Sequence, residues 1–366
     1  MEQSKMRFGK IIIYAGGVIA FYIGSGFATM QEIMQYNVAY GSSHWIVVAT
    51  CALIFVYTNW SFITNGYKYQ LNRGTDVFNV YCGKYIGKFF DLWAVLFCYM
   101  SFWVMCGGAS STATQQWGFP TGVGTAILVV AVVATVIFGL DGVVNALGCV
   151  GPIIIVCVIF TSVFVAIRDA GNLSAGMALI DSGTLELVKV GNSPISSGAS
   201  YAGFVVLWFA PYLAELGAKN NGKEVNTGAI LGAILIFTAT ICCTFALASN
   251  IELVAAVDIP SLTLAGTISP IFSTVFAIII FCGIYTTAVP LLWTPARRFG
   301  EEGTNRYRIL VIALALVGVV AALFFPYRSL VNVIYGLNGY LGFVVVAFMV
   351  VADIRHFILK HEYKAS

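Results

Sequence analysis

Charged residues are scarce in this chain. Only 10% of its 366 residues are Asp, Glu, Lys or Arg, whereas 59% are hydrophobic. Water-soluble domains carry about a quarter charged residues, because a folded surface in water needs them. The composition therefore excludes an ordinary soluble protein and predicts an integral membrane protein in a lipid bilayer. At about 20 residues per spanning helix, the length accommodates ten spans with short loops and no separate soluble domain.

Signs of metal, disulfide or nucleic-acid chemistry are also missing. The nine cysteines form no Cys-x-x-Cys pair, and all but Cys82 lie in apolar runs. We therefore expect buried free thiols and no cofactor. The formal net charge of +3 is too small to indicate a nucleic-acid partner.

Histidine is rare, and its placement argues against an enzyme. The string Gly198–Ala202 matches the G-x-S-x-A pattern of an intramembrane serine protease, but Ser200 would need a general base. His44, His356 and His361 all lie at the ends of apolar stretches or outside them. A channel would need a filter ring or pore-lining charges, and no such motif is present. We expect neither an enzyme nor a channel.

Ten long apolar stretches run through the sequence. The first continues well past the length of a secretory signal, so we expect it to be an anchored helix. Segment 250–267 is interrupted by Asp258–Ile259–Pro260 and predicts a re-entrant or surface helix rather than a span. The ten predicted spans cover residues 9–38, 44–64, 86–114, 120–139, 142–167, 197–218, 226–249, 268–296, 308–325 and 329–352.

The basic residues predict the orientation of these spans. With the N-terminus inside and ten crossings, only Arg168, Lys189 and Arg328 fall outside, and the other 16 of the 19 Lys and Arg residues fall inside. This bias follows the positive-inside rule. We therefore expect a protein of the cytoplasmic membrane with both termini in the cytoplasm.

The longest loop divides the chain into two halves of five spans each. We expect a first repeat over residues 1–167, an extracellular connecting loop over 168–196 and a second repeat with a cytoplasmic tail over 197–366. Because five is odd, structurally similar halves must be inverted relative to each other in the membrane. Inverted repeats are typical of secondary transporters, in which the first helix of each half is broken near the midplane.

Both of those helices contain residues that disfavour a continuous helix. Ile23–Phe27 reads Ile-Gly-Ser-Gly-Phe at the centre of the first span, where two glycines free backbone groups. Glu32 follows on the same span, and Pro211 lies at the centre of the sixth. Free N–H groups after such a break attract an anionic ligand group. Close helix packing and an ordinary proline kink are the alternatives.

These two segments resemble known transporter motifs. Ile23–Phe27 is similar to the glycine motif in helix 1 of the amino acid–polyamine–organocation transporters. Phe209–Glu215 is similar in spacing to their helix 6 motif, except that Leu213 stands where they usually carry glycine. The longer string Gly24–Ile33 resembles the YkvI-like putative amino-acid permeases. The resemblance implies a LeuT-type fold of ten helices, with helices 1 and 6 broken, that works by alternating access.

The predicted substrate is a small zwitterionic solute, an amino acid or a related amine. Free backbone groups at the breaks would bind its charged ends, and mid-depth aromatic residues would wall the pocket. The substrate-binding candidates are Gly24, Ser25, Gly26, Phe27, Tyr99, Phe102, Trp208, Phe209, Ala210 and Tyr285.

The eighth span carries a candidate cation site. Thr286 and Thr287 are adjacent hydroxyls at mid-membrane, with Gly283 one turn earlier, and oxygen ligands suit Na+. In the resembled fold the other ligands are helix 1 carbonyls, which map onto Ala20 and Ile23. The alternative is that both threonines bond carbonyls of their own helix. The resemblance also implies that a proton-coupled relative would carry a lysine in helix 5, and the fifth span here has none, so sodium is the expected coupling ion.

Two intramembrane carboxylates leave other readings open. Placing the charged side chain of Glu32 or Glu215 in a bilayer costs free energy, so each is by default a candidate functional residue. Either residue could carry a proton or bind a substrate amine, or it could fix helices by hydrogen bonding. A proton-coupled permease and a non-transporting solute receptor on the same fold are therefore the alternative functions.

Overall fold

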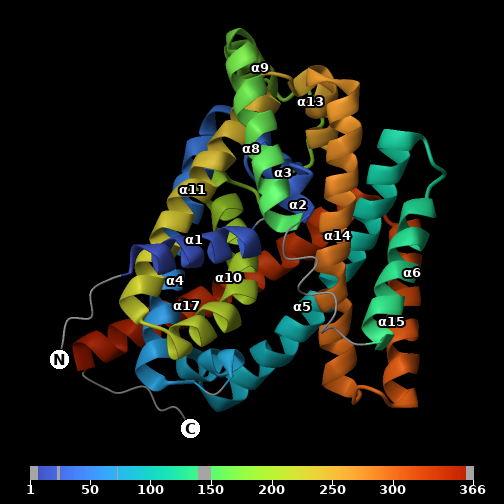
Figure 1. Cartoon of the computed structure of the whole chain (residues 1–366). Coiled ribbons are helices and arrows are strands. Elements are labelled where there is room, and N and C mark those ends of the chain that lie inside the picture. The colour runs from blue at the N-terminus through green and yellow to red at the C-terminus, as the bar shows by residue number, and fades with distance from the viewer. Residues whose placement is uncertain (1–6, 23–24, 72, 139–149, 360–366) are drawn as a thin grey trace.

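The computed structural model of this chain describes residues 7–22, 25–71, 73–138 and 150–359. Every regular element in those ranges is a helix, and no strand occurs among them (Figure 1). The predicted all-helical class is confirmed.

The helices follow the two halves of the sequence. The first half contains α1 (Phe8–Tyr22), α2 (Ser25–Ala28), α3 (Gln31–Tyr36), η1 (Val38–Ser43), α4 (His44–Tyr69), η2 (Gly74–Asp76), α5 (Val77–Trp117), α6 (Val123–Phe138), α8 (Val150–Arg168), η3 (Ala170–Asn172) and α9 (Leu173–Asp181). The second half contains α10 (Pro194–Lys219), α11 (Gly222–Ala248), α12 (Ile251–Val254), α13 (Pro260–Ile268), α14 (Pro270–Phe299), α15 (Asn305–Phe324), α16 (Tyr327–Leu330), η4 (Val331–Tyr335) and α17 (Gly336–Leu359).

Apolar helices overlap all ten predicted stretches, and seven or eight of the described helices are long and apolar enough to be spans. Seven described helices are long and apolar enough to cross a membrane, and α8 with Ala170–Asp181 forms an eighth that is bent by 69°. Two shorter apolar segments, Phe8–Ile19 and Val123–Ile137, lie in α1 and α6. Each predicted stretch overlaps one of these helices.

Two predicted boundaries differ from the structure. Helix α5 begins at Val77, well before residue 86, and Gly83 with φ of 72° bends it between a short first part and the apolar span. The segment 168–196 contains helix α9 rather than loop alone. By contrast, segment 250–267 contains the short helices α12 and α13, as predicted.

Helix α10 packs at the centre of the bundle against α4 and α17. A Cβ atom added at Gly203 would collide with the carbonyl oxygen of Gly339, and one added at Gly66 would collide with that of Ala214. Small residues let membrane helices approach to backbone contact, where dispersion forces and weak polar contacts hold them. The glycines of these helices therefore set how closely α10 can pack in the core.

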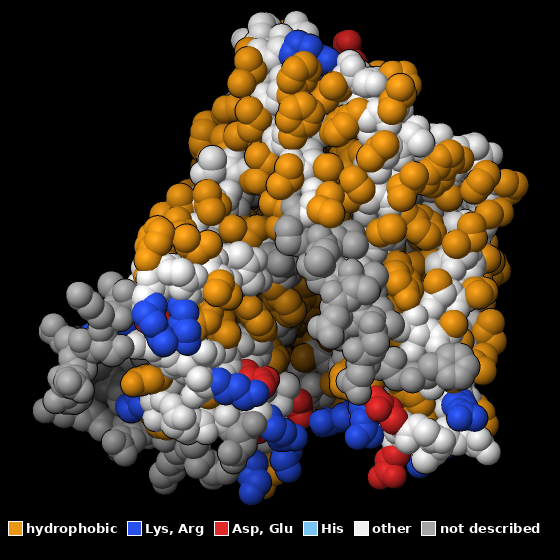
Figure 2. All heavy atoms as spheres, in the orientation of Figure 1, with side chains coloured by type: hydrophobic (Ala, Val, Ile, Leu, Met, Phe, Trp, Pro, Cys, Tyr) orange, Lys and Arg blue, Asp and Glu red, His pale blue; other side chains and the backbone are white. Residues whose placement is uncertain are grey.

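The two ends of the bundle differ in charge. Figure 2 shows most of the visible Lys and Arg side chains along its lower edge, with apolar side chains covering the surface above them. Arg73, Lys88 and Arg298 line one polar cavity there. We call this the basic end, and the opposite end, where α9 and α13 lie in Figure 1, the far end.

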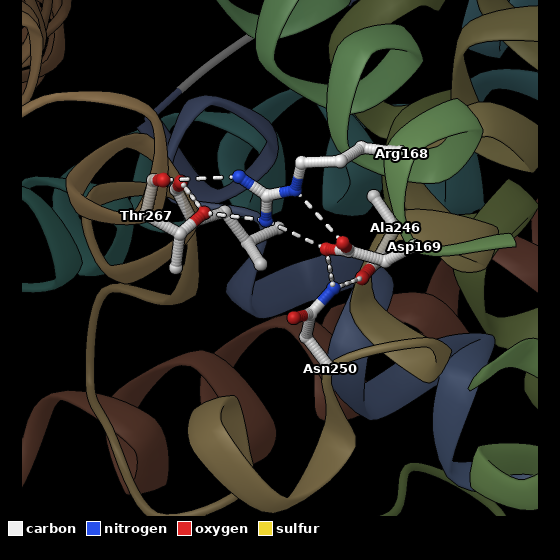
Figure 3. A network of polar contacts seen from close by, with 6 residues as sticks. Arg168, Asp169, Ala246, Asn250 and Thr267 are labelled. Atoms are coloured by element: carbon white, nitrogen blue, oxygen red, sulfur yellow. Dashed lines mark hydrogen bonds and ion pairs between the residues drawn. The ribbon is translucent and has the colours of Figure 1, made fainter. Parts of the chain in front are cut away.

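A polar network ties the two halves together at the far end (Figure 3). The Arg168 guanidinium forms two hydrogen bonds with Asp169, at 2.8 and 2.6 Å, and donates to the Thr267 carbonyl at 2.9 Å. Asn250 donates to the Asp169 carboxylate at 2.9 Å. The Arg168 guanidinium holds the pKa of Asp169 below its usual value. The end of α8 is thereby joined to α11 and α13.

Candidate functional site

The first span is interrupted shortly after the glycine motif, between α2 and α3. Helix α1 ends at Tyr22, α2 runs only from Ser25 to Ala28, and α3 begins at Gln31. Between α2 and α3, Met30 adopts a left-handed conformation with φ of 62°, which a non-glycine residue adopts rarely. Thr29 supports this turn by donating from Oγ1 to the Gly26 carbonyl at 3.0 Å. Ile23 and Gly24 lie outside the described residues.

The sixth span is not broken. Helix α10 is one α-helix from Pro194 to Lys219 with Pro211 inside it, so the prediction of an unwound segment there is wrong. Proline removes only one backbone hydrogen bond, and a packed helix can absorb that loss as a local bend. The carbonyl of Pro211 also packs closely on Gly74, where an added Cβ would collide with it. Packing therefore keeps the helix continuous through this point.

Glu32 is folded back onto the glycine motif. A Cβ atom added at Gly26 would collide with Oε1 of Glu32, so the carboxyl group covers the open face of this glycine. The side chain is buried, with 5% of its surface exposed. The Tyr201 hydroxyl donates to its Oε2 at a long 3.5 Å. None of the ion pairs among the described residues includes Glu32.

Four buried tyrosines lie close enough to Glu32 to interact with its charge, and we call these five residues the Glu32 cluster. They are Tyr22, Tyr36, Tyr201 and Tyr335. The rings of Tyr36 and Tyr201 stack with centroids 4.7 Å apart. Three spans meet in this cluster, because its members come from the broken first span, from α10 and from η4.

A cavity of about 580 Å³ lies near the cluster and extends to the basic end. Helices α1, α5, α10 and α14 supply its walls. Its lining includes Phe21, Asp91, Trp208, Glu215, Thr286 and Thr287. A second cavity of about 490 Å³ lies at the far end, lined in part by Ser111 and Asp258. Ser111 and Asp91 are both on α5, and 20 residues of helix rise about 30 Å, so the cavities approach the bundle centre from opposite ends.

Only one predicted aromatic residue lines the basic-end cavity. Trp208 does so, whereas the Tyr99 hydroxyl donates to the Leu314 carbonyl at 3.0 Å and Phe102 packs against Gly318 of α15. Tyr99 and Phe102 therefore face α15 instead of walling the pocket. Mid-membrane depth in the sequence does not specify which side of a helix faces the cavity.

Three further substrate candidates are buried in packing contacts. Phe27 contacts the Tyr22 ring, and Phe209 packs edge-on against Phe21. Ala210 is buried beside it. Ser25 is the first residue of α2, and its side chain lies outside the described part of the structure.

Tyr285 points away from the cavity. Its hydroxyl is 2.5 Å from the Thr135 hydroxyl, which places it against α6. The prediction that it walls the pocket is therefore not supported by its position. Tyr285 instead joins two neighbouring spans by a hydrogen bond.

Thr286 and Thr287 line the basic-end cavity but already have partners. Both hydroxyls donate to the Gly283 carbonyl, at 2.8 and 2.9 Å. Ile154 packs against Gly283, where an added Cβ would collide with the isoleucine side chain, so this position favours glycine. Each hydroxyl oxygen keeps a lone pair that could face a cation. The sodium site with the carbonyls of Ala20 and Ile23 stays a prediction, since Ile23 lies outside the described residues.

Glu215 lies at the mouth of the cavity and is half-exposed. It forms an ion pair with Lys219 of the same helix, four residues on. This ion pair lies within one helix, so it does not support the alternative in which Glu215 joins neighbouring helices. The pair sits on one helix surface next to solvent, where such pairs contribute little.

Sequence reasoning missed most of the Glu32 cluster. Tyr22 and Tyr36 flank the broken segment and could have been noticed from that position alone. Tyr201 and Tyr335 are distant in sequence, and only the packing of α10 and η4 on the first span brings them to Glu32. Within the described residues no group of His, Cys, Asp and Glu is arranged to hold a metal ion.

Comparison with known proteins identifies the fold. No family model matches the chain. The uncharacterised protein YyaD of Bacillus subtilis (strain 168) is 21% identical over 340 residues, which cover 89% of this chain and 91% of YyaD.

Three solved structures share the architecture. MhsT in complex with L-phenylalanine gives a TM-score of 0.63 at 16% identity, covering 94% of this chain and 89% of MhsT. The inward-facing conformation of Mhp1 gives 0.57 at 15% identity, covering 98% and 79%. A single-residue mutant of the manganese transporter of Eremococcus coleocola gives 0.55 at 11% identity, covering 96% and 80%. These are LeuT-fold proteins, and the predicted LeuT-type fold is confirmed.

Proposed function

We propose that this protein is a secondary transporter of a small amino acid or related amine, working by alternating access. The observation that carries the proposal is the first span of a LeuT-type fold, which is interrupted between α2 and α3 and which borders, through Phe21, a cavity that extends to one end of the bundle. Irregular backbone inside a membrane is tolerated where it borders a cavity or ligand. The L-phenylalanine bound to the structurally similar MhsT agrees with a solute of this size.

The orientation and coupling belong to the same proposal. With the basic end in the cytoplasm, the larger cavity is the inward-facing vestibule of the cytoplasmic membrane. Sodium is the proposed coupling ion, bound near Thr286 and Thr287, because both line that vestibule. The competing mechanism is proton coupling through Glu32 or Glu215.

Ligand screening followed by flux measurement tests this function. Purified protein is heated with individual amino acids and amines, with and without Na+. A solute at 100 times its Kd should stabilise the folded state by about 2.7 kcal/mol, which appears as a higher Tm. The stabilising solute is then offered to proteoliposomes. Uptake supports a transporter, whereas binding without uptake indicates a receptor on the same fold. Stabilisation only by lipids or large hydrophobic compounds would contradict the proposed substrate class.

A further inference from the structure

The Glu32 carboxyl group is buried without a positively charged partner. Among the described residues no Lys, Arg or His pairs with it, and its one hydrogen bond is the long contact with Tyr201. An ionised carboxylate in a low-dielectric interior requires a counter-charge or a proton. Structural carboxylates are usually satisfied by several donors or an ion pair, and Glu32 has neither. The site is therefore electrostatically incomplete.

Glu32 also occupies the space beside Gly26, where the sequence predicts that a charged end of the substrate binds. Its Oε1 covers Gly26, the glycine whose missing side chain leaves the backbone of the broken span open to close approach. A ligand carboxylate placed there would meet a like charge at short range. When it is ionised, Glu32 supplies a negative charge at this position, and the ligand group that complements it is positive.

The surroundings of Glu32 are aromatic, with unused hydroxyl groups. The Tyr335 hydroxyl has no hydrogen-bond partner in the described part of the chain. The Tyr22 hydroxyl faces Tyr201 and Cys51, and the Tyr36 hydroxyl faces Ser200, without reaching hydrogen-bond geometry. Ring faces attract cations, and phenol oxygens accept hydrogen bonds from ammonium groups. Clusters of aromatic rings are a known means of binding ammonium ligands.

A row of rings connects this cluster to the basic-end cavity. Trp208 lines the cavity, and its ring lies 6.3 Å from Tyr335 and 6.4 Å from Phe204, centroid to centroid. Phe204 in turn stacks on Tyr201 at 5.4 Å. The Trp208 indole N–H has no partner among the described residues. Several of these rings stack on one another, so an ammonium group moving from the cavity to Glu32 would have to separate them.

We propose that the Glu32 cluster binds the ammonium group of the substrate, and that the substrate is a carboxylate-free organic amine rather than a zwitterionic amino acid. This inference rests on the proposed transport function and narrows its substrate class. Glu32 provides the negative charge, and the tyrosine rings and hydroxyls surround the cation. The apolar part of the amine faces Trp208 and the cavity.

Matched ligands test the proposal on the unaltered protein. Two series are used: L-phenylalanine, 2-phenylethylamine and 3-phenylpropanoate, and L-leucine, isoamylamine and 4-methylpentanoate. Binding is measured by calorimetry at pH 7. We expect each amine to bind at least tenfold more tightly than its amino acid, and the carboxylates not to bind. Amino acids that bind more tightly than their amines would overturn the proposal, and so would failure of both amines to bind.

A pair of substitutions tests the role of Glu32. Glu32→Gln keeps the shape of the side chain and removes its charge, and it should weaken amine binding at least tenfold. Glu252→Gln removes an exposed acid at the far end and should leave binding unchanged. Amine affinity retained in Glu32→Gln, with only the pH dependence of transport lost, would assign Glu32 a proton instead and overturn the proposal. Tyr335→Phe keeps the ring and removes the hydroxyl, so it should weaken amine binding less than Glu32→Gln does. It is the variant to use if Glu32→Gln misfolds. An amine affinity unchanged by Tyr335→Phe would contradict a role of the tyrosine hydroxyls in the Glu32 cluster.

Flux separates this inference from the function on which it rests. Amines that bind as expected but are not taken up by proteoliposomes would refute the transporter while leaving the amine site standing. Uptake of amino acids without uptake of their amines would support the transporter and refute the amine site. The two failures therefore give different results.

Discussion

The open face of Gly26 is filled by the Glu32 carboxyl group. Any side chain at position 26 must displace this carboxyl group from the cluster. A side chain at residue 26 would therefore change the position of Glu32 in the cluster. A substitution there should change ligand binding before it changes insertion into the membrane, because the span keeps its apolar character.

We expect Gly26→Leu to abolish solute binding while the protein still inserts and purifies as a folded species. The leucine side chain cannot share its space with Glu32, but it does not lower the hydrophobicity of the span. Gly16→Leu is the matched control, since Gly16 lies in α1 and an added Cβ meets nothing within 4 Å. Ligand-induced change in Tm is the measurement. Normal binding by Gly26→Leu would reduce the glycine motif to helix packing.

The second prediction at this scale concerns sodium. Thr287→Val preserves shape but removes the oxygen, and it should raise the Na+ concentration needed for half-maximal uptake about tenfold, equivalent to about 1.4 kcal/mol. Thr287→Ser should retain most of the sodium dependence. Linkage requires that sodium and substrate strengthen each other's binding if both sites share the first span.

Uptake in sodium and in choline buffer at fixed pH checks the same prediction. Equal rates of the unaltered protein in the two buffers would remove the sodium site. The two threonines would then serve only the hydrogen bonds to Gly283 that the structure contains. Transport that follows pH and is lost in Glu32→Gln or Glu215→Gln would support proton coupling.

Among the elements, α10 combines a proline with a continuous helical backbone. Its neighbours α4 and α17 approach so closely that glycines are needed at the contacts. Gly203 and Gly342 face each other across the α10–α17 contact, where a Cβ on either would strike the other chain segment. This close contact explains how α10 can contain Pro211 and remain one helix, because packing on several sides restrains it.

We expect Gly203→Ala to lower the Tm, although alanine is favoured over glycine in a helix by about 1 kcal/mol. The new methyl group would collide with the Gly339 carbonyl oxygen, and overpacking typically costs about 1–3 kcal/mol. Gly171→Ala, in the exposed η3 turn with nothing within 4 Å, is the control and should change the Tm little. A raised Tm for Gly203→Ala would show that α10 and α17 separate readily.

At the scale of the whole molecule, the two cavities lie at opposite ends of one bundle. The far-end cavity is bordered by Asp258, which accepts hydrogen bonds from Ser111 at 2.7 Å and from Arg328 at 3.1 Å. These contacts join α5, the α12–α13 connection and α16. Opening of the far-end cavity would have to break these hydrogen bonds of Asp258, so they stabilise the closed far end.

The charge difference between the two ends predicts which of them faces the cytoplasm. Glu301→Cys, exposed between α14 and α15 at the basic end, should be inaccessible to a membrane-impermeant maleimide added to intact cells. Glu252→Cys, exposed at the far end, should be labelled. Both should react after permeabilisation, and the unaltered protein, whose described cysteines are buried or partly buried, measures the background. The reverse labelling pattern would place the basic end outside.

The sequence by itself determined the architecture of this protein. Low charge, ten apolar stretches and their flanking cations reflect transfer of each segment from water to lipid, and this depends on local composition. An interruption of the first span was also predictable, because glycines weaken a helix wherever they occur, although the described turn lies at Met30, beyond Gly26. These features need no knowledge of which residues come together.

Only the tertiary structure decided the site. Pro211 predicted a break in α10, but contacts with α4, η2 and α17 keep that helix continuous. Tyr99, Phe102 and Tyr285 had suitable depth, yet helix rotation turns them toward α15 and α6. Tyr201 and Tyr335 join Glu32 from α10 and η4. Which face of a helix meets which neighbour depends on packing between segments far apart in sequence, and no local pattern encodes it.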